Sequence, residues 1–543
     1  MDVPNRKPER VIIAVLSIVF VIWSAAFILK SSFIAVDGKR YFSLFDDAMI
    51  SMRYAWNFSH GLGLVWNPGE HIEGYTNLLM TLLMSFATLI FNKSNAVLVI
   101  QVSGAVFMLA IAYVSMRIAD HITQDEGYPR QGLVRVLVFF SVLFYYPLAY
   151  WSLMGMETGL LTLLLLLGVL SAFNYTKTRN PATLFWVAGY LGLAFLTRND
   201  TIIFAILIMS YIIWETFKQK SDRKILWQLL APIGLYFLFV VGQLVFQYLY
   251  YGEWLPNTYT LKLSGMPLLV RIKGGIGFVT PFLIVTAFIL VLSSLDLIFD
   301  FTQRKLVLLS LGLSAIAYQI YVGGDPWNYW RIMSPTMPLL IILFISAINA
   351  VIHAISNTQI FRGYFLRNPI FPRKYMAGAL VITFTLIGML SANQVFLPEI
   401  SLASAPYQAS ANQKNVQTAL VINQLTTGDA SIGILWAGSI PYYTDRKAID
   451  FLGKSDRYIA NLPPDLSGKV SWSGMKSVPG HNKYDLNYSI KTLKPTYVQD
   501  FKWGQDDLSK WSKTNYVLIY YDGVFLSLLK DSPAVLWGKI NAH

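Results

Sequence analysis

Long apolar segments alternate with short polar loops along the first 394 residues of the chain. Most segments hold about 15–25 residues, the length that an α-helix needs to cross a hydrocarbon core about 30 Å thick. The pattern predicts a membrane α-helical protein with about eleven transmembrane helices. These helices lie near residues 11–29, 96–118, 133–150, 160–173, 182–196, 202–214, 225–250, 275–299, 306–322, 337–355 and 376–391.

One further apolar segment, Leu78–Phe91, has only 14 residues and is short for a span. Lysine and arginine gather in cytoplasmic loops, so their distribution decides between the two topologies. If the segment does not span, the cytoplasmic loops hold 18 of these residues and the outer loops before the C-terminal region hold 10; if it spans, the numbers are 9 and 19. The first topology is favoured, with the N-terminus in the cytoplasm and the C-terminal region outside.

The pattern changes after residue 394, because no apolar run long enough to span follows. A helical pattern covers 408–425, and strand patterns cover 430–436, 497–501 and 516–520. The sequence therefore predicts two domains. One is a transmembrane domain, 1–394, with a first extracytoplasmic loop over 30–95, and the other is an extracytoplasmic α/β domain, 395–543.

Composition agrees with this assignment. Of the 543 residues, 55% are hydrophobic and only 13% are charged, whereas soluble domains contain roughly 25% charged residues. The absence of cysteine excludes disulfide scaffolds and thiol chemistry. The net charge of +13 is typical of basic cytoplasmic loops that contact anionic membrane lipids, and no nucleic-acid partner is expected.

The longest polar loop, 43–77, is rich in ionisable and aromatic residues. Asp46 and Arg53 share one face of a predicted helix over 46–57, and Asp47 lies about 100° around it. An acidic residue stabilises the N-terminus of a helix, and this effect would account for one of the two aspartates. A long loop rich in Gly, Trp and Asn beside a membrane is instead typical of a functional site. Four shorter loops carry ionisable residues on the same predicted side of the membrane: 153–160, 196–200, 250–262 and 323–331.

These residue types suit a sugar carried on a polyprenyl phosphate. A carboxylate can deprotonate an acceptor hydroxyl, and arginine forks bind phosphate. The sequence has no P-loop, GxSxG or HExxH motif, and its six histidines have no metal-ligand spacing. The alternative is a transporter or flippase of lipid-linked saccharides, which should show paired repeats and helices broken at the membrane midplane.

The string FDDAMISMRYAWNFSHGLGLVWNPGEHIEGYTN, residues 45–77, resembles the first extracytoplasmic loop of bacterial GT-C glycosyltransferases. It is most similar to the terminal β-(1→2) arabinofuranosyltransferase group, with the pattern D-D-A-x-I-x-x-R-Y-A-x-N, then G-x-G-x-V-x-N-P-G and E-G-Y-T-N. Later strings also resemble landmarks of this group: GMET, LTRND, YYGEWLPNTY and GGDPWNYWR, with WAGSIPYYTDRKAIDFLGKSDRYIA and PGHNKYD in the C-terminal region.

The resemblance implies a GT-C multi-pass bundle in the cytoplasmic (inner) membrane, with a role in cell wall biogenesis. It implies inverting transfer of a sugar, arabinofuranose in the named group, from a polyprenyl (decaprenyl) phosphate to a cell-envelope glycan or glycolipid acceptor. GT-C enzymes with and without a divalent cation exist, so the metal and the cofactor stay open.

The predicted site combines these arguments. By match to the motif, Asp46 is the expected base and Asp47 supports it. Three arginines are expected to bind the donor phosphate, and seven further residues are expected to contact the sugar or the acceptor. The arginines are Arg53, Arg198 and Arg331, and the seven are Asn57, Glu73, Tyr75, Asn77, Glu157, Asn257 and Asp325.

Overall fold

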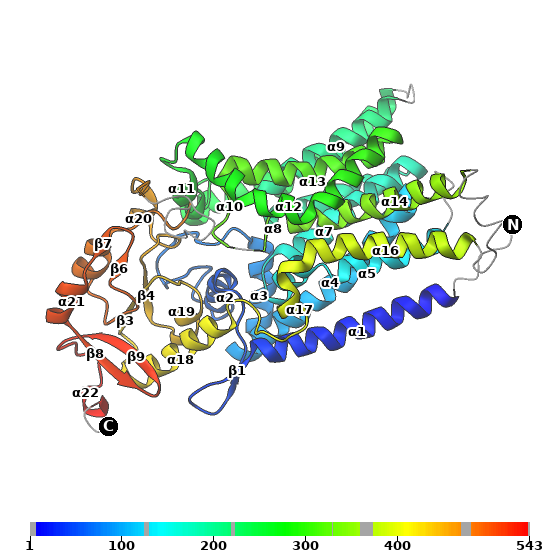
Figure 1. Ribbon diagram of the computed structural model, residues 1–543. Coiled ribbons are helices and arrows are strands. Elements are labelled where there is room, and N and C mark those ends of the chain that lie inside the picture. Colours follow the sequence, from blue (N-terminus) through cyan, green and yellow to red (C-terminus); the bar gives the residue numbers. More distant parts are fainter. Residues whose placement is uncertain are drawn as a thin grey trace.

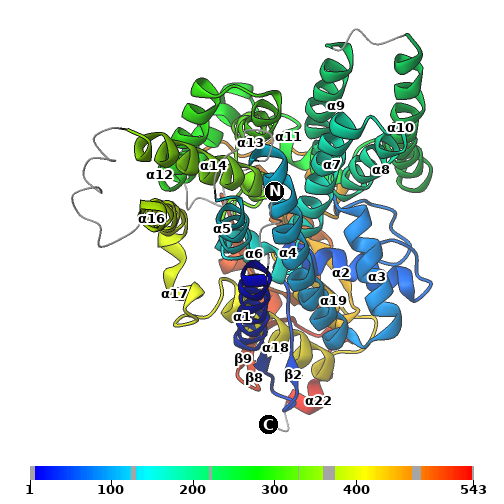
Figure 2. The ribbon, with the colours of Figure 1, turned by 90° about the vertical axis from the view of Figure 1, so that its right-hand side faces the viewer.

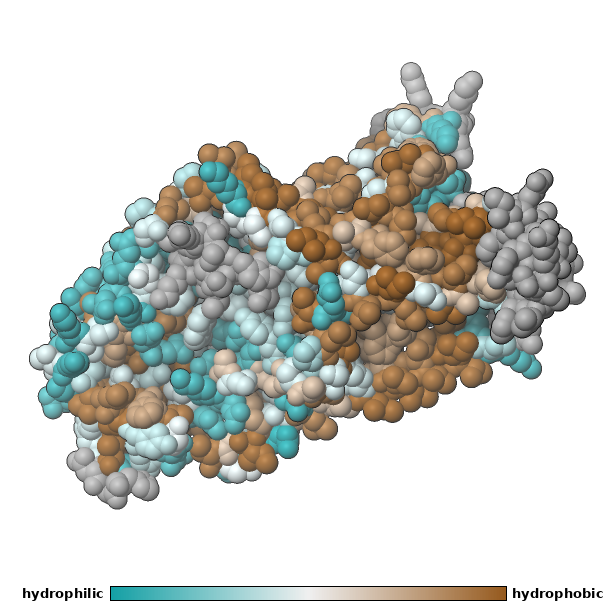
Figure 3. All heavy atoms as spheres, in the orientation of Figure 1, coloured by the Kyte–Doolittle hydropathy of each residue, from teal (hydrophilic) through white to brown (hydrophobic). Residues whose placement is uncertain are grey.

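The protein has a bundle of long helices at one end and a mixed β-sheet at the other (Figure 1). The computed structural model describes residues 7–123, 130–218, 223–327, 329–358, 373–467 and 479–540. Apolar side chains cover the outside of the bundle, whereas the sheet-containing end is mostly hydrophilic (Figure 3). This division is the one expected when the bundle lies in a membrane and the sheet lies in water.

Nine helical segments in the described part of the chain are long and apolar enough to cross a membrane, one of them, Asn199–Phe217, as a short 3₁₀ helix continued by an α-helix. All eleven predicted segments are helical, and the two that fall short of that test are a bent pair and one short helix. The nine are α1 (Lys7–Ser31), α4 (Lys93–Thr123), α7 (Thr158–Thr178), α9 (Ile202–Phe217), α10 (Arg223–Tyr251), α12 (Leu268–Phe299), α13 (Gln303–Val322), α14 (Met337–Ser356) and α16 (Arg373–Asn393); the others are α5 (Gln131–Leu143) with α6 (Tyr146–Leu153), and α8 (Ala182–Thr197). Part of the predicted inner loop before α16, with Arg362 and Arg367, lies outside the described residues.

The bend between α5 and α6 measures 52° and has a local cause. Pro147 sits in the first turn of α6, where its missing N–H costs nothing but prevents a continuous helix. The amide of Asn393, at the end of α16, satisfies the freed backbone groups. It accepts a bond from Tyr146 N at 2.9 Å and donates to Phe144 O at 3.0 Å.

Two shorter helices pack together at the sheet end of the bundle (Figures 1 and 2). They are α2 (Asp46–Ser59) and α3 (Leu78–Ile90). Helix α3 has 13 residues, so it is too short to span, as predicted. Helix α2 begins with two aspartates, which favour a helix N-terminus. Short elements elsewhere are β1 (Phe33–Ile34), β2 (Arg40–Tyr41), η1 (Asn199–Thr201), α11 (Asn257–Leu263), η2 (Ser334–Thr336), η3 (Gln394–Phe396) and α17 (Leu397–Ile400).

The sheet has five strands in the order β4-β3-β5-β9-β8. Strand β3 is parallel to β4 and β5, whereas β9 is antiparallel to β5 and β8. The predicted helix and three predicted strands of this region are confirmed as α18, β3, β5 and β8. The elements are α18 (Ala409–Leu425), β3 (Ser431–Ile434), α19 (Ser439–Thr444), β4 (Lys447–Asp450), α20 (Arg457–Asn461), η5 (Asn487–Thr492), β5 (Tyr497–Val498), β6 (Lys502–Trp503), β7 (Asp506–Asp507), α21 (Ser509–Asn515), β8 (Tyr516–Tyr521), β9 (Val524–Leu529) and α22 (Trp537–Ile540).

The carboxyl ends of β3 and β4 face the start of α2. Because the two strands are parallel, the segments that follow them emerge at one edge of the sheet, where α/β folds commonly bind ligands. The segment after β3 places Gly438 against Asp46, and the turn after β4 carries Lys454 to Asp47. The fold thus joins the C-terminal sheet to the first loop at the two aspartates.

The topology predicts that the sheet end lies outside the cell. Ser404 and Ala182 are exposed near opposite ends of the bundle, Ser404 shortly before α18 and Ala182 at the start of α8. Because the chain has no cysteine, Ser404→Cys and Ala182→Cys each create a single label site. We expect a membrane-impermeant maleimide to label Ser404→Cys in intact cells and Ala182→Cys only after permeabilisation. The reverse pattern would contradict the predicted orientation.

Candidate functional site

A cavity of about 410 Å³ lies where the helix bundle meets the C-terminal sheet. Its walls come from α2, the segment 74–77, the first turns of α7 and α9, α11, the end of α13 and the loop 324–332. Apolar side chains, among them Ile202, Leu255 and Val322, line it together with ionisable ones. The cavity can therefore hold a ligand with a charged group and an apolar chain.

Asp47 lies at the centre of the ionisable lining. One carboxylate oxygen is 2.5 Å from Nζ of Lys454, and the other is 3.1 Å from a guanidinium nitrogen of Arg331. Burial alone would raise the pKa of Asp47, but the two cations outweigh burial and hold this pKa well below its usual range. Asp47 is therefore ionised, and both of its oxygens are occupied.

Arg331 is aimed into the cavity by a loop with an unusual backbone. Its second nitrogen binds Asp325 at 2.9 Å. Tyr329 and Trp330, directly before Arg331, have φ values of 70° and 48°, which bulky residues rarely adopt. The indole of Trp151 donates a hydrogen bond to the Tyr329 carbonyl at 2.9 Å and helps to hold this conformation. The ion pair with Asp325 and the strained turn together fix the guanidinium.

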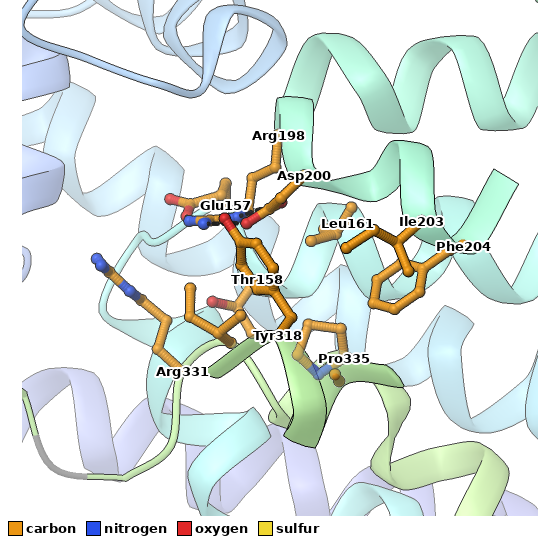
Figure 4. Close-up of a pocket in the computed structure, with 12 residues that line it drawn as sticks. Glu157, Thr158, Leu161, Arg198, Asp200, Ile203, Phe204, Tyr318, Arg331 and Pro335 are labelled. Carbon is orange, nitrogen blue, oxygen red and sulfur yellow. Dashed lines mark hydrogen bonds and ion pairs between the residues drawn. The ribbon is translucent and has the colours of Figure 1, made fainter. Parts of the chain in front are cut away.

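A second ionic group lies deeper, at the starts of α7 and α9. Arg198 binds Glu157 at 2.9 Å and Asp200 at 2.6 Å. Asn77 donates to the other oxygen of Glu157 at 3.2 Å and accepts from Ser51 of α2 at 2.9 Å. Figure 4 shows this group on one side of a narrow recess, with Leu161, Ile203 and Phe204 on the other. Arg198 is thus paired with two carboxylates.

Lys262, in the last turn of α11, also lines the cavity. No hydrogen bond or ion pair joins its ammonium group to any residue that the structure describes. Burial lowers the pKa of Lys262; Asp325 and Asp47 oppose this shift, whereas Arg331 and Lys454 add to it. Lys262 therefore has an amino group without a direct partner among the described residues, and a bound anion would favour its charged form.

The described residues contain no group of three or more His, Asp or Glu side chains arranged to hold a metal ion. Each carboxylate of the cavity already faces an arginine or a lysine. The carboxylates therefore serve first as partners of cations.

Seven of the twelve predicted site residues line the cavity, and five do not. Asp46 is buried beneath the cavity wall. Its carboxylate lies 3.4 Å from Ser439 N, and burial raises the pKa of Asp46 to about 6. The residues in the lining are Asp47, Tyr75, Asn77, Glu157, Arg198, Asp325 and Arg331.

The other four residues outside the cavity hold the frame of the first loop. Arg53 forms an ion pair with Asp445 at 2.6 Å and does not line the cavity, whereas a contact with the donor phosphate was expected. Asn57 donates to the carbonyls of Val65 and Trp66. These contacts are structural rather than sugar-binding.

Glu73 and Asn257 also face protein groups. Both carboxylate oxygens of Glu73 accept from Gln247, and burial raises the pKa of Glu73 to about 8. Asn257 donates to the carbonyls of Gly453 and Lys454 at 2.9 and 3.0 Å. Neither side chain reaches the cavity, in contrast to the predicted role in sugar or acceptor binding.

Sequence analysis missed three ionisable residues of the lining: Asp200, Lys262 and Lys454. Asp200 follows Arg198 by two residues in the LTRND string, which was the available signal. Lys262 and Lys454 lie in strings that resemble GT-C landmarks or follow them directly, but a lysine in a loop gives no sign of the direction it faces.

Solved structures with a similar fold include two that contain a polyprenyl phosphate. ArnT from Cupriavidus metallidurans bound to undecaprenyl phosphate has a TM-score of 0.56 at 10% identity, over 95% of this chain and 98% of that one. The oligosaccharyltransferase AglB from Archaeoglobus fulgidus, in complex with an inhibitory peptide and a dolichol-phosphate, has a TM-score of 0.54 at 12% identity, over 97% of this chain and 75% of that one. The predicted GT-C fold, a helical bundle with a C-terminal sheet domain, is confirmed.

Sequence comparison adds one match. Residues 402–535 match a family model described as a domain of unknown function, DUF8728. No curated protein matches the sequence. The family match contains the five-stranded sheet and Lys454, and it leaves the helix bundle outside.

The contact between Gly438 and Asp46 can be tested by adding a methyl group. A Cβ at Gly438 would lie 2.2 Å from the backbone oxygen of Asp46 and 2.9 Å from Met49 Cβ. Overpacking of this kind costs about 1–3 kcal/mol, so we expect Gly438→Ala to lower the free energy of unfolding by that amount. Thermal denaturation of the purified protein measures it. Gly428→Ala is the matched control, because nothing lies within 4 Å of its Cβ, and equal stability of the two variants would contradict the contact.

Proposed function

We propose that the protein is a GT-C membrane glycosyltransferase that moves a sugar from a polyprenyl phosphate to a glycan or glycolipid acceptor. The cavity carries this proposal, because it combines paired carboxylates, four cations and an apolar wall at the end of a membrane bundle. Two proteins of similar fold were solved with undecaprenyl phosphate and with a dolichol-phosphate. These ligands have the charged group and the apolar chain that the cavity suits.

In this proposal the donor phosphate lies near Arg331, and the polyprenyl chain follows the apolar side chains of α9 and α11. The two terminal nitrogens of Arg331 are held by Asp47 and Asp325, but its Nε is a buried donor without a hydrogen-bond partner among the described residues and can bind a phosphate oxygen. Glu157 and Asn77, which lie between the arginines and α2, are then placed to contact the sugar.

Asp47 is the proposed base, in place of Asp46. It is the member of the pair that reaches the cavity, and it is ionised. The acceptor hydroxyl gives its proton to Asp47 while its oxygen bonds to the anomeric carbon. The bond from this carbon to the phosphate oxygen breaks, and its electron pair leaves with the phosphate. Attack from the face opposite the phosphate inverts the anomeric centre.

The finer assignments rest on the family resemblance. They are arabinofuranose as the sugar, a cell-envelope acceptor, and a reaction on the outer side of the inner membrane. The division into a transmembrane catalytic domain, 1–394, and an extracytoplasmic domain, 395–543, belongs to the same proposal. The DUF8728 match at 402–535 falls within the second of these.

Replacing each aspartate by asparagine separates the two candidates for the base. Asparagine keeps the shape of the side chain but removes the basic carboxylate. We expect Asp47→Asn to lower turnover by about 10²–10⁴-fold, the usual effect of losing a general base. Asp46→Asn should lose less, because Asp46 does not face the cavity. The assay follows transfer from radiolabelled polyprenyl-phosphate sugars, including decaprenyl-phosphate arabinose, by chromatography of the product.

Asp522→Asn, at an exposed turn between β8 and β9, is the control for the loss of one negative charge. Normal turnover in Asp47→Asn together with an inactive Asp46→Asn would return the role of base to Asp46. Movement of the labelled lipid across the membrane without transfer of its sugar would favour the transporter alternative.

A further inference from the structure

The lining of the cavity has four cations and four carboxylates, and three of the cations lie around Asp47. Three cations, Lys262, Arg331 and Lys454, face two carboxylates there, Asp47 and Asp325. Arg331 binds both carboxylates and Lys454 shares Asp47, so the charge of Lys262 stays without a direct partner among the described residues. An anionic group, such as a phosphodiester, can therefore bind beside Lys262.

Hydrogen bonds fix the backbone at Lys454, and its ammonium group is carried on a flexible stem. Both oxygens of Asp450 hold the turn after β4, by bonds from Leu452 N at 3.0 Å and Ser455 N at 2.9 Å. Asn257 binds the carbonyl of Lys454 itself at 3.0 Å. The ammonium of lysine turns on a flexible four-carbon stem. It can therefore change partners inside the cavity while the turn stays in place.

The ion pair with Lys454 makes Asp47 a weaker base. Each oxygen of Asp47 binds one cation, and both cations stabilise the ionised form of the carboxylate. A pKa held far below neutrality makes proton transfer to Asp47 unfavourable. Movement of one of the two cations away from Asp47 would raise the basicity of this carboxylate.

We propose that the donor phosphate binds between Lys262 and Lys454 and draws Lys454 away from Asp47, so that donor binding itself frees the base. This inference rests on the proposed function and deepens it. It gives the domain of unknown function over 402–535 a role, because this domain supplies the lysine. Cleavage of the sugar–phosphate bond leaves a phosphate monoester with more negative charge, which the two lysines then bind more strongly.

Binding of undecaprenyl phosphate to the full chain in lipid nanodiscs tests the lysine without any transfer of sugar. A hydrogen bond to a charged group contributes about 1.5–3 kcal/mol, so Lys454→Met should weaken binding by about 10- to 100-fold. Lys447→Met is the matched control on the same domain, because Lys447 is exposed and binds Glu70 outside the cavity. Undecaprenol, which lacks the phosphate, should bind wild type and Lys454→Met equally.

An exchange of partners predicts that substitutions of Asp47 and Lys454 affect phosphate binding in a coupled way, which a phosphate site with unchanging partners does not predict. Asp47 competes with the phosphate for Lys454, so Asp47→Asn should bind undecaprenyl phosphate about tenfold more tightly than wild type does. This gain should shrink to twofold or less when Lys454→Met is already present. An equal gain in both backgrounds would mean that Asp47 only repels the phosphate, and it would overturn the exchange.

Two further results keep the inference apart from the proposed function. Inorganic phosphate at millimolar concentration should compete weakly with the lipid; equal affinity would show a site for free phosphate and would overturn the role of the donor. If wild type binds undecaprenyl phosphate with the expected cycle but transfers no sugar from any donor, the proposed function fails while the lysine exchange stands. If wild type transfers sugar and Lys454→Met binds normally, the exchange fails alone.

Discussion

The structure depends on one carboxylate held between two cations from distant parts of the chain. Asp47 opens α2, Arg331 comes from the loop after α13, and Lys454 comes from the turn after β4. The exposed fractions of these three side chains are only 17%, 6% and 13%. Buried charges are tolerated when they are paired, and removal of one partner typically costs about 3–5 kcal/mol. The ionic group therefore joins the membrane bundle, the first loop and the C-terminal sheet at one point.

The sequence predicted the fold well because length and hydrophobicity decide it. A helix in lipid must satisfy its backbone internally, so each apolar segment of sufficient length becomes a helix. The short segment Leu78–Phe91 forms a helix of 13 residues, which is shorter than a span needs, and the positions of Lys and Arg predict that it stays outside the membrane. The break within 133–150 was missed, since it depends on Pro147 and on an amide from α16. Long-range partners of this kind leave no local pattern.

The site was predicted only in part, because several of its contacts join residues that are far apart in the chain. Local motifs indicated Asp47, Glu157, Arg198, Asp325 and Arg331, because ionisable groups at the ends of spans gather at one membrane face. They could not tell which neighbour of a pair faces the cavity. The helix of Asp46 and Asp47 turns by about 100° per residue, and the sheet edge covers the first aspartate. Arg53 was assigned to phosphate because it is an arginine in the first loop. Its actual partner, Asp445, lies 392 residues further along the chain and could not be found from local sequence.

The amide of Asn393 also constrains the order in which the bundle is completed. A chain is made from its N-terminus, so the break between α5 and α6 enters the membrane long before α16 exists. Until then Tyr146 N and Phe144 O lack the partner that the finished protein gives them. An unsatisfied backbone group is costly in lipid. The end of α16 therefore completes these two hydrogen bonds only late in biosynthesis, and a protein truncated before residue 393 would lack both.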